Sequence, residues 1–192
     1  MSNNPQQDIK EFRRQLLSLV KDAHAYAKVE GINFFVQNFN RQGFLDTSLE
    51  AWPKRGLETG GGSILVKSGT LKRSIKANSK SLDVEFYTDG IAPYASIHNE
   101  GGEIVVTAKM KRYFWAMFYK YSGKVGRRKS GEMSRSKASV AMNTRALYFR
   151  GLAMKRVGSK IKIPKRQFMG ESQTLLRNFD TWVLNEIDKR FK

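Results

Sequence analysis

The stretch that decides the fold class is Ser-Leu-Asp-Val-Glu-Phe-Tyr-Thr, residues 81–88. Apolar and polar side chains alternate along it, and the apolar series is Leu82, Val84 and Phe86. Because successive side chains of a strand point to opposite faces, this alternation predicts a strand with one buried face. Residues 74–78 lie at hairpin distance before it and can pair with it as a second strand.

Amphipathic helices are predicted towards both ends of the chain. Residues 9–29 carry apolar side chains at three- and four-residue steps, which makes one face of a helix apolar. Asp8 is placed to cap this helix, and Gly31 is expected to break or end it. A second short helix over 33–40 is expected to bring three aromatic residues into the core, namely Phe34, Phe35 and Phe39. The same spacing over 171–191 predicts a closing helix.

Shorter elements are predicted between these helices. Residues 41–63 are rich in turn residues and predict a loop anchored by Phe44 and Trp52, with 60–62 as a flexible glycine lead. The other expected elements are a helical turn at 70–75 with Ser68 as its N-cap, a short helix at 93–99 and strands at 103–107 and 160–167. The fold class is therefore α+β, with a small antiparallel sheet flanked by N- and C-terminal helices in a single domain over 1–192.

Positive charge is concentrated in one part of the sequence. The 192 residues include 35 Lys and Arg against 17 Asp and Glu, a formal net charge of +18. Residues 107–162 hold 16 of the basic residues and one acidic residue, Glu132. We interpret 109–160 as a basic insertion in which two helices, 109–121 and 138–154, surround a flexible loop at 123–137. So much charge of one sign requires an anionic partner.

The flexible loop carries six cations that are candidate contacts to DNA or to an acidic partner. They are Lys124, Arg127, Arg128, Lys129, Arg135 and Lys137. Two interpretations stay open: a mobile arm on nucleic acid with Tyr and Trp nearby for stacking, or a loop that orders against an acidic neighbouring subunit. The sequence contains no recognised nucleic-acid-binding motif, so sequence-specific readout is not expected.

The composition argues against several classes of protein. Cysteine is absent and the two histidines are His24 and His98, so neither a disulfide framework nor a thiolate or histidine-rich metal centre is expected. No window approaches the roughly 20 apolar residues of a membrane span. Residues 61–68 and 123–130 end in Lys-Ser like a phosphate-binding loop, but both lack its second glycine. We expect no enzyme activity, no cofactor, no bound metal and no membrane contact.

A metal-dependent nuclease is a less favoured enzymatic alternative. Its carboxylates would be Asp83, Glu85 and Asp89, with Lys109 as a cation near them. The alternation over 81–88 instead places Asp83 and Glu85 on the solvent face of a strand, and we prefer that interpretation.

Four local patterns, in order along the chain, resemble one known family. They are Trp-Pro-Lys-Arg at 52–55, Ile-Leu-Val-Lys-Ser-Gly-Thr-Leu-Lys-Arg-Ser-Ile at 64–75, Tyr-Ala-Ser-Ile-His-Asn-Glu-Gly-Gly at 94–102 and Ile-Pro-Lys-Arg-Gln-Phe-Met-Gly at 163–170. The ordered set is similar to the tailed-phage virion morphogenesis family, which comprises small tail-completion or head–tail joining proteins. The similarity covers residues 8–108 and 160–192, whereas the segment between them is longer and more basic than the family's usual connection.

The resemblance implies a non-enzymatic structural protein that completes the phage tail or joins it to the head, as a ring on the tail or neck axis. The implied partners are further copies of the chain, tail-tube or neck proteins and, non-specifically, packaged DNA. The implied location is the tail–head junction of the virion, after assembly in the host cytoplasm. A small nucleic-acid-binding protein without sequence specificity is the alternative.

The resemblance also marks a set of residues for fold maintenance or subunit contacts. They are Trp52, Ser68, Gly69, Leu71, Ser74, Tyr94, His98, Gly101, Pro164, Arg166 and Phe168. For His98 we expect a buried, hydrogen-bonded side chain rather than a metal ligand or catalytic group.

Overall fold

The computed structural model describes residues 5–57, 62–81 and 83–191, which form two compact units. The first unit contains the described residues of 1–53, 62–100 and 165–192, and the second contains those of 54–61 and 101–164. The single domain expected from the sequence, with its insertion at 109–160, stays a prediction.

A long helix, α1 (Pro5–Arg41), is the largest element of the first unit. The prediction that Gly31 breaks or ends it is wrong, because the helix continues through this residue. Gly31 is buried, and a Cβ atom added there would overlap the ring of Phe86. The glycine therefore allows helix and strand to approach closely, while the helical backbone stays regular.

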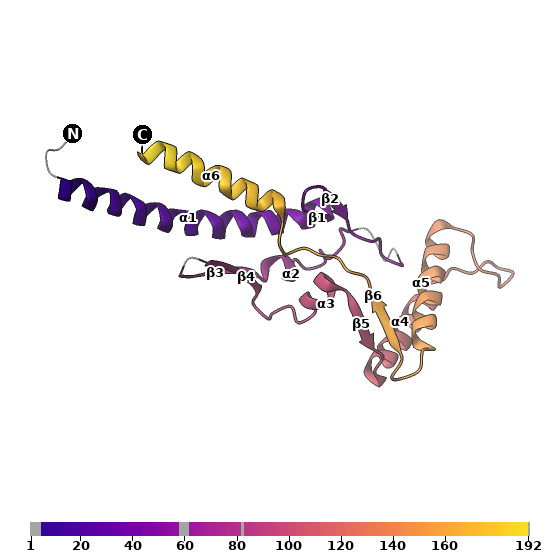
Figure 1. Cartoon of the computed structure of the whole chain (residues 1–192). Coiled ribbons are helices and arrows are strands. Elements are labelled where there is room, and N and C mark those ends of the chain that lie inside the picture. The colour runs from indigo at the N-terminus through magenta and orange to yellow at the C-terminus, as the bar shows by residue number, and fades with distance from the viewer. Residues whose placement is uncertain (1–4, 58–61, 82, 192) are drawn as a thin grey trace. The chain divides into compact units, whose positions relative to one another are not determined.

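The closing helix, α6 (Gln173–Phe191), runs beside α1 (Figure 1). The ring centroids of Tyr26 and Trp182 stack 4.4 Å apart, and those of Phe12 and Phe191 are 5.3 Å apart. Arg190 donates to the Asp22 carboxylate at 2.8 Å. The two terminal helices thus pair along their lengths, although none of the described residues of α6 is fully buried.

The α+β class is confirmed, with the strands divided among three two-stranded antiparallel sheets in the described residues. Strand β3 (Ile75–Lys80) pairs with β4 (Asp83–Thr88), so that Ile75 faces Thr88 and Lys80 faces Asp83. Val84 and Phe86 are half-buried while Asp83 and Glu85 are exposed, as the alternation predicts. Leu82, the first apolar residue of that series, lies outside the described residues.

A second hairpin occupies part of the segment predicted to be a loop. Strand β1 (Gly43–Leu45) pairs with β2 (Leu49–Ala51), and the prediction of a continuous loop over 41–63 is wrong there. The backbone N–H of Leu45 donates to Asn38 Oδ1 of α1 at 3.3 Å, and that of Trp52 donates to the Gln42 carbonyl at 2.8 Å. Three-residue strands held by such contacts carry no periodic signal in the sequence.

Two short helices complete the first unit. Helix α2 (Thr70–Arg73) follows Gly69, which is its N-cap and has a left-handed backbone with φ of 72°. The predicted N-cap, Ser68, lies one residue earlier, and its hydroxyl bonds that of Thr70 at 2.8 Å. Helix α3 (Ala95–Glu100) precedes Gly101, another left-handed residue with φ of 73°.

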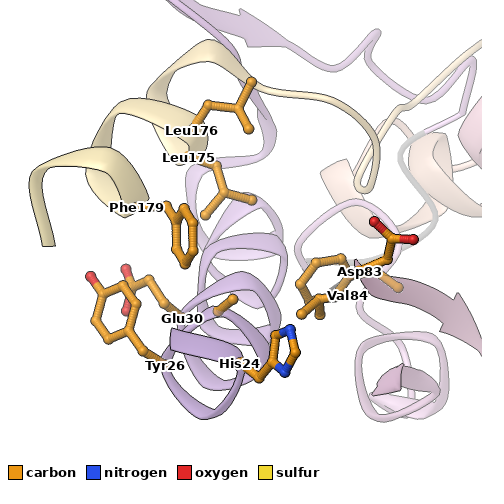
Figure 2. Close-up of a pocket in the computed structure, with 10 residues that line it drawn as sticks. His24, Tyr26, Glu30, Asp83, Val84, Leu175, Leu176 and Phe179 are labelled. Atoms are coloured by element: carbon orange, nitrogen blue, oxygen red, sulfur yellow. The ribbon is translucent and has the colours of Figure 1, made fainter. Parts of the chain in front are cut away.

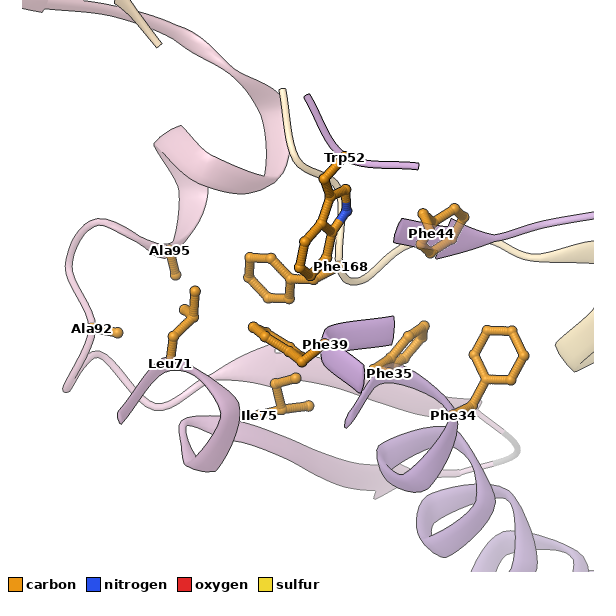
Figure 3. Packing of buried hydrophobic residues seen from close by; sticks show 10 residues of the cluster. All are labelled: Phe34, Phe35, Phe39, Phe44, Trp52, Leu71, Ile75, Ala92, Ala95 and Phe168. Atoms are coloured by element: carbon orange, nitrogen blue, oxygen red, sulfur yellow. The ribbon is translucent and has the colours of Figure 1, made fainter. Parts of the chain in front are cut away.

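The core of the first unit gathers aromatic side chains from distant parts of the sequence (Figure 3). Phe39 of α1 lies at its centre, with its ring centroid 5.5 Å from that of Trp52 and 5.3 Å from that of Phe168. Phe34 and Phe35 are also buried, which confirms the predicted aromatic cluster. Leu71 and Ile75 close the core from the side of α2 and β3.

The second unit combines a helix pair with the third sheet. Helices α4 (Ala108–Ser122) and α5 (Lys137–Ala153) share a core of Phe114, Phe149 and Ala153. Strand β5 (Gly102–Val105) pairs with β6 (Lys160–Ile163), which ends before Pro164. Proline lacks the N–H that would continue the ladder.

Candidate functional site

The first and third sequence motifs make hydrogen bonds to residues 165–169 of the fourth, a segment that we call the motif hub, and Leu71 of the second motif lies in the same hydrophobic core. Trp52, from the first motif, donates its indole N–H to the carbonyl oxygen of Gln167 at 2.6 Å. Phe168 is fully buried between these elements, and Asn38 of α1 donates to its carbonyl oxygen at 3.2 Å. Residues 165–169 form no helix or strand, so side chains of other segments supply hydrogen-bond partners for their backbone carbonyl groups. Buried backbone polar groups need such partners.

Asn99, from the third motif, makes the largest set of these bonds. Its side-chain oxygen accepts from the backbone N–H groups of Phe168 at 2.9 Å and Met169 at 3.0 Å. Its side-chain nitrogen donates to the Met169 carbonyl at 3.0 Å. Asn99 lies within the third motif, but the sequence indicates no role for it, because a single asparagine carries no spacing signal.

Arg166 connects the hub to two other motifs. Its backbone N–H donates to the His98 carbonyl at 2.8 Å, and its side-chain Nε donates to the Pro53 carbonyl at 3.0 Å. The residue is only 8% exposed. A guanidinium stays charged in proteins, so its burial depends on such oxygen partners.

His98 differs from its predicted environment. The side chain is half-buried rather than buried, and among the described residues its buried Nδ1 atom has no hydrogen-bond partner. Burial lowers the pKa of His98 below its usual 6.5, and the nearby charge of Arg166 lowers it further. The expected hydrogen bond of the His98 side chain is thus not made at Nδ1, and the bond to Arg166 is accepted by the His98 backbone carbonyl.

The remaining motif residues divide between the core and the surface. Leu71 and Ser74 are buried, and the Ser74 hydroxyl donates to the Leu71 carbonyl at 2.8 Å. Ser68 and Tyr94 are exposed. Pro164 is half-buried directly after β6. The assignment of motif residues to subunit contacts stays a prediction, and the buried ones have an evident role in packing.

The six cations proposed to contact DNA or an acidic partner are all exposed in the second unit. Their segment folds back on itself through a bridge between Arg127 and Met133, and Arg128 N–H donates to the Glu132 carbonyl at 2.8 Å. The hydroxyl of Ser139 on α5 donates to the Gly126 carbonyl at 3.1 Å. The result is a small turn, and we call its three consecutive cations, Arg127, Arg128 and Lys129, the basic tip. Its predicted flexibility stays a prediction.

A groove in the first unit was not anticipated from the sequence. Two adjoining cavities, of about 240 and 490 Å³, share Val84, Phe86, Leu175 and Leu176 as lining residues. In Figure 2, α6 contributes Leu175 and Phe179 on one side and β4 contributes Val84 on the other. Four carboxylates line this acidic groove, namely Glu30, Asp83, Glu100 and Glu171, and no Lys or Arg does.

Among the described residues, no group of three or more His, Asp or Glu side chains could hold a metal ion. None of the helices in this part of the chain has both the length and the apolar composition needed to cross a membrane.

Comparison with known proteins gives one match. A model of the phage virion morphogenesis family matches residues 46–187, about three quarters of the chain. The matched range contains all four motifs and the intervening basic segment. No curated protein and no solved structure matches the chain.

Proposed function

The chain belongs to the phage virion morphogenesis family, and from this premise we propose that it completes the tail or joins the tail to the head. In this role it forms a ring on the tail or neck axis at the tail–head junction. Its partners are further copies of itself and tail-tube or neck proteins. The family is a structural one, and the proposed role needs binding surfaces rather than catalytic chemistry.

The observation that carries this proposal is the apolar surface left exposed on three helices. The exposed residues are Ile9, Phe12, Leu16 and Leu17 on α1, Val140 and Leu147 on α5 with Met154 at its C-cap, and Leu176, Leu184 and Ile187 on α6. Single apolar side chains on a surface are ordinary, but rows of them on helix faces mark protein–protein contacts. A structural protein that functions in an assembly accounts for such rows.

The test is a deletion of the gene in the phage or prophage that encodes the chain. We expect the deletion to yield separate heads and tails in electron micrographs, and a plasmid copy of the gene to restore complete particles. Normal yields of infectious, joined particles from the deletion would contradict the proposal.

A second candidate function rests on the charge of the second unit. Residues 54–61 and 101–164 contain 18 Lys and Arg against three Asp and Glu, a net charge of +15. A surface of this kind supports non-specific binding to nucleic acid, in which counterion release makes affinity fall steeply with salt. This function would be favoured over the first by two results together. The purified protein would bind duplex DNA with an affinity that falls steeply with salt, and the phage that lacks the gene would still form normally joined particles.

A further inference from the structure

Helix α5 is apolar on two opposite sides. Phe149 and Ala153 are buried on the side that shares a core with α4. Val140, Leu147 and Met154 recur every seven residues on the other side, and their exposed fractions are 44%, 53% and 65%. At 3.6 residues per turn, steps of seven return to nearly the same direction. A helix with a single packing partner has one apolar face, so the second face is available to another surface.

Gly151 lies in the same row, and we call Val140, Leu147, Gly151 and Met154 the α5 stripe. No atom lies within 4 Å of the position that a Cβ would take at Gly151. The glycine therefore leaves a flat site at which another backbone or side chain can approach closely. Lys137 and Arg150, both exposed, lie on either side of the stripe, and α5 contains no acidic residue.

The acidic groove has the complementary properties. We call its apolar lining residues the floor and its four carboxylates the rim, and no Lys or Arg lines it. This is unusual in a chain with a formal net charge of +18. Leu176 lines both cavities and is 51% exposed, so the floor is open to an incoming apolar side chain.

We propose that copies of this chain associate head to tail, with the α5 stripe of one copy in the acidic groove of the next. The inference rests on the proposed function, which requires self-association, and it names the two surfaces that make the contact. Leu147 and Met154 would cover the apolar floor, while Lys137 and Arg150 would face the carboxylates of the rim. Contacts between two different surfaces are heterologous and generate a ring when the rotation closes.

Charge identifies the occupant of the groove. A partner for this groove should be both apolar and basic, and the α5 stripe has both properties on a helix that contains no carboxylate. The exposed apolar row at the start of α1 fits less well, because Asp8 and Glu11 are interspersed with Ile9 and Phe12. Opposite potentials across an interface also select the partner and set its register.

The experiment measures oligomeric mass by light scattering on the full-length protein free of nucleic acid, over a range of protein concentrations. Leu147→Glu places a negative charge on the stripe, and Leu176→Lys places a positive charge in the groove. Both residues are about half exposed, so each variant is expected to fold. We expect the wild type to form a discrete oligomer, and each variant alone to be monomeric.

An equimolar mixture of the two variants provides the decisive measurement. The Leu176→Lys chain keeps its stripe and the Leu147→Glu chain keeps its groove, so one contact can form and no further chain can add. We expect a mass twice that of the monomer. A mixture that stays monomeric would overturn the proposal, because the contact would then be absent or made within one chain.

Two matched controls carry the same changes on the same helices. Ala138→Glu is exposed on α5 about 160° around the helix from Val140. Leu184→Lys is exposed on α6 and does not line the groove. Both are expected to keep the wild-type mass. An oligomer that survives Leu147→Glu or Leu176→Lys, or a wild type that stays monomeric at every concentration, would overturn the contact. The proposed role in tail completion or head–tail joining would stand in either case if deletion of the gene still left heads and tails unjoined, whereas a wild type that stays monomeric would also contradict the proposed ring.

Discussion

Phe168 is the residue at which the largest number of distant segments meet. It is fully buried, its ring lies beside that of Phe39, and its backbone is bonded by Asn38 and Asn99. Through its ring and its backbone, Phe168 thus connects the segment leading to α6 with α1 and α3. In such a position a residue contributes to stability through packing and also by holding polar backbone in place.

Phe168→Ala is therefore expected to destabilise the protein by about 3–5 kcal/mol, the usual range for removing a buried phenylalanine side chain. The measurement is the free energy of unfolding from urea titration of wild type and variant. Phe12→Ala, at an exposed position on α1, is the control and is expected to cost about 1 kcal/mol or less. Equal losses for the two variants would show that the hub is not the main core of the chain.

His98 makes the stability of the fold depend on pH. Its pKa is lowered by burial and then by Arg166, so the folded protein favours the neutral ring. Below pH 6.5 the unfolded chain takes up a proton that the folded chain resists. Stability is therefore full above about pH 6.5 and falls with pH down to the lowered pKa of the folded state.

His98→Gln is expected to weaken this dependence. The measurement compares urea midpoints of wild type and variant at pH 8 and pH 5. The wild type should lose more stability than the variant over this interval, because only the wild type has the His98 ring. Both proteins contain the same carboxylates, so the effect of the carboxylates cancels in the comparison. Equal losses would mean that the histidine is solvated in the folded protein and that its environment differs from the one described.

At the scale of elements, α1 and α5 each contain one interior glycine, and the surroundings of the two glycines are opposite. A Cβ at Gly31 would overlap the ring of Phe86, which in turn packs edge-on against Phe35. A Cβ at Gly151 would enter open space. The helix propensity of alanine favours a Gly→Ala substitution at both positions by about 1 kcal/mol. The surroundings of each glycine therefore decide whether the substitution stabilises or destabilises the protein.

We expect Gly151→Ala to stabilise the protein by about 0.5–1 kcal/mol through the propensity of α5. Gly31→Ala should instead destabilise it by about 1–3 kcal/mol, because overpacking displaces Phe86. Both values follow from the free energy of unfolding in urea. Stabilisation by Gly31→Ala would indicate that α1 and β4 are not in close contact, and so would undermine the explanation for the unbroken helix.

The elements that sequence reasoning located are those with a periodic pattern. The closing helix, the helices of the basic segment and the strand at Val84 and Phe86 follow from apolar spacing, and the structure has them within a few residues. The break at Gly31 was wrong because a glycine can serve tertiary packing as well as a helix end. The β1–β2 hairpin was missed because its strands are three residues long and are held by Asn38 and Gln42 rather than by alternation.

The candidate sites were predictable to a smaller extent. Resemblance marked Trp52, Arg166 and Phe168 without showing that they meet, since spatial convergence is not visible in linear order. The acidic groove could not be predicted at all, because its four carboxylates come from α1, β4, α3 and the segment just before α6. The cationic surface of the basic tip, by contrast, could be predicted, since its basic residues are consecutive in the sequence and exposed in the structure.

At the scale of the whole molecule, the two units differ strongly in charge. The first unit has 17 basic and 14 acidic residues, a net of +3, whereas the second has a net of +15. In the proposed self-association, Lys137 and Arg150 in the second unit of one copy would face the carboxylates in the first unit of the next copy. Part of the positive charge of the second unit would thereby be neutralised. The basic tip, in contrast, is not needed for that contact and remains available to a further anionic partner.

Reversal of the tip by Arg127→Glu, Arg128→Glu and Lys129→Glu is therefore expected to leave fold and oligomeric mass unchanged and to block head–tail joining. The three side chains are exposed, and surface changes of this kind usually alter stability by less than about 0.5 kcal/mol each. Circular dichroism and thermal unfolding check the fold, and complementation of the deletion checks joining. A variant that restores normal infectious yield would refute a role for the tip.

The partner of the tip can be identified from the same variant. The matched control, Lys10→Glu with Arg13→Glu and Lys21→Glu, changes the net charge equally at exposed positions of α1. If the tip contacts DNA, the logarithm of duplex affinity should fall less steeply with the logarithm of salt concentration in the tip variant, by about 0.9 per phosphate contact removed. The control should keep the wild-type slope. If the slope is the same in all three proteins while joining is lost only with the tip variant, the tip binds an acidic protein surface of the junction instead.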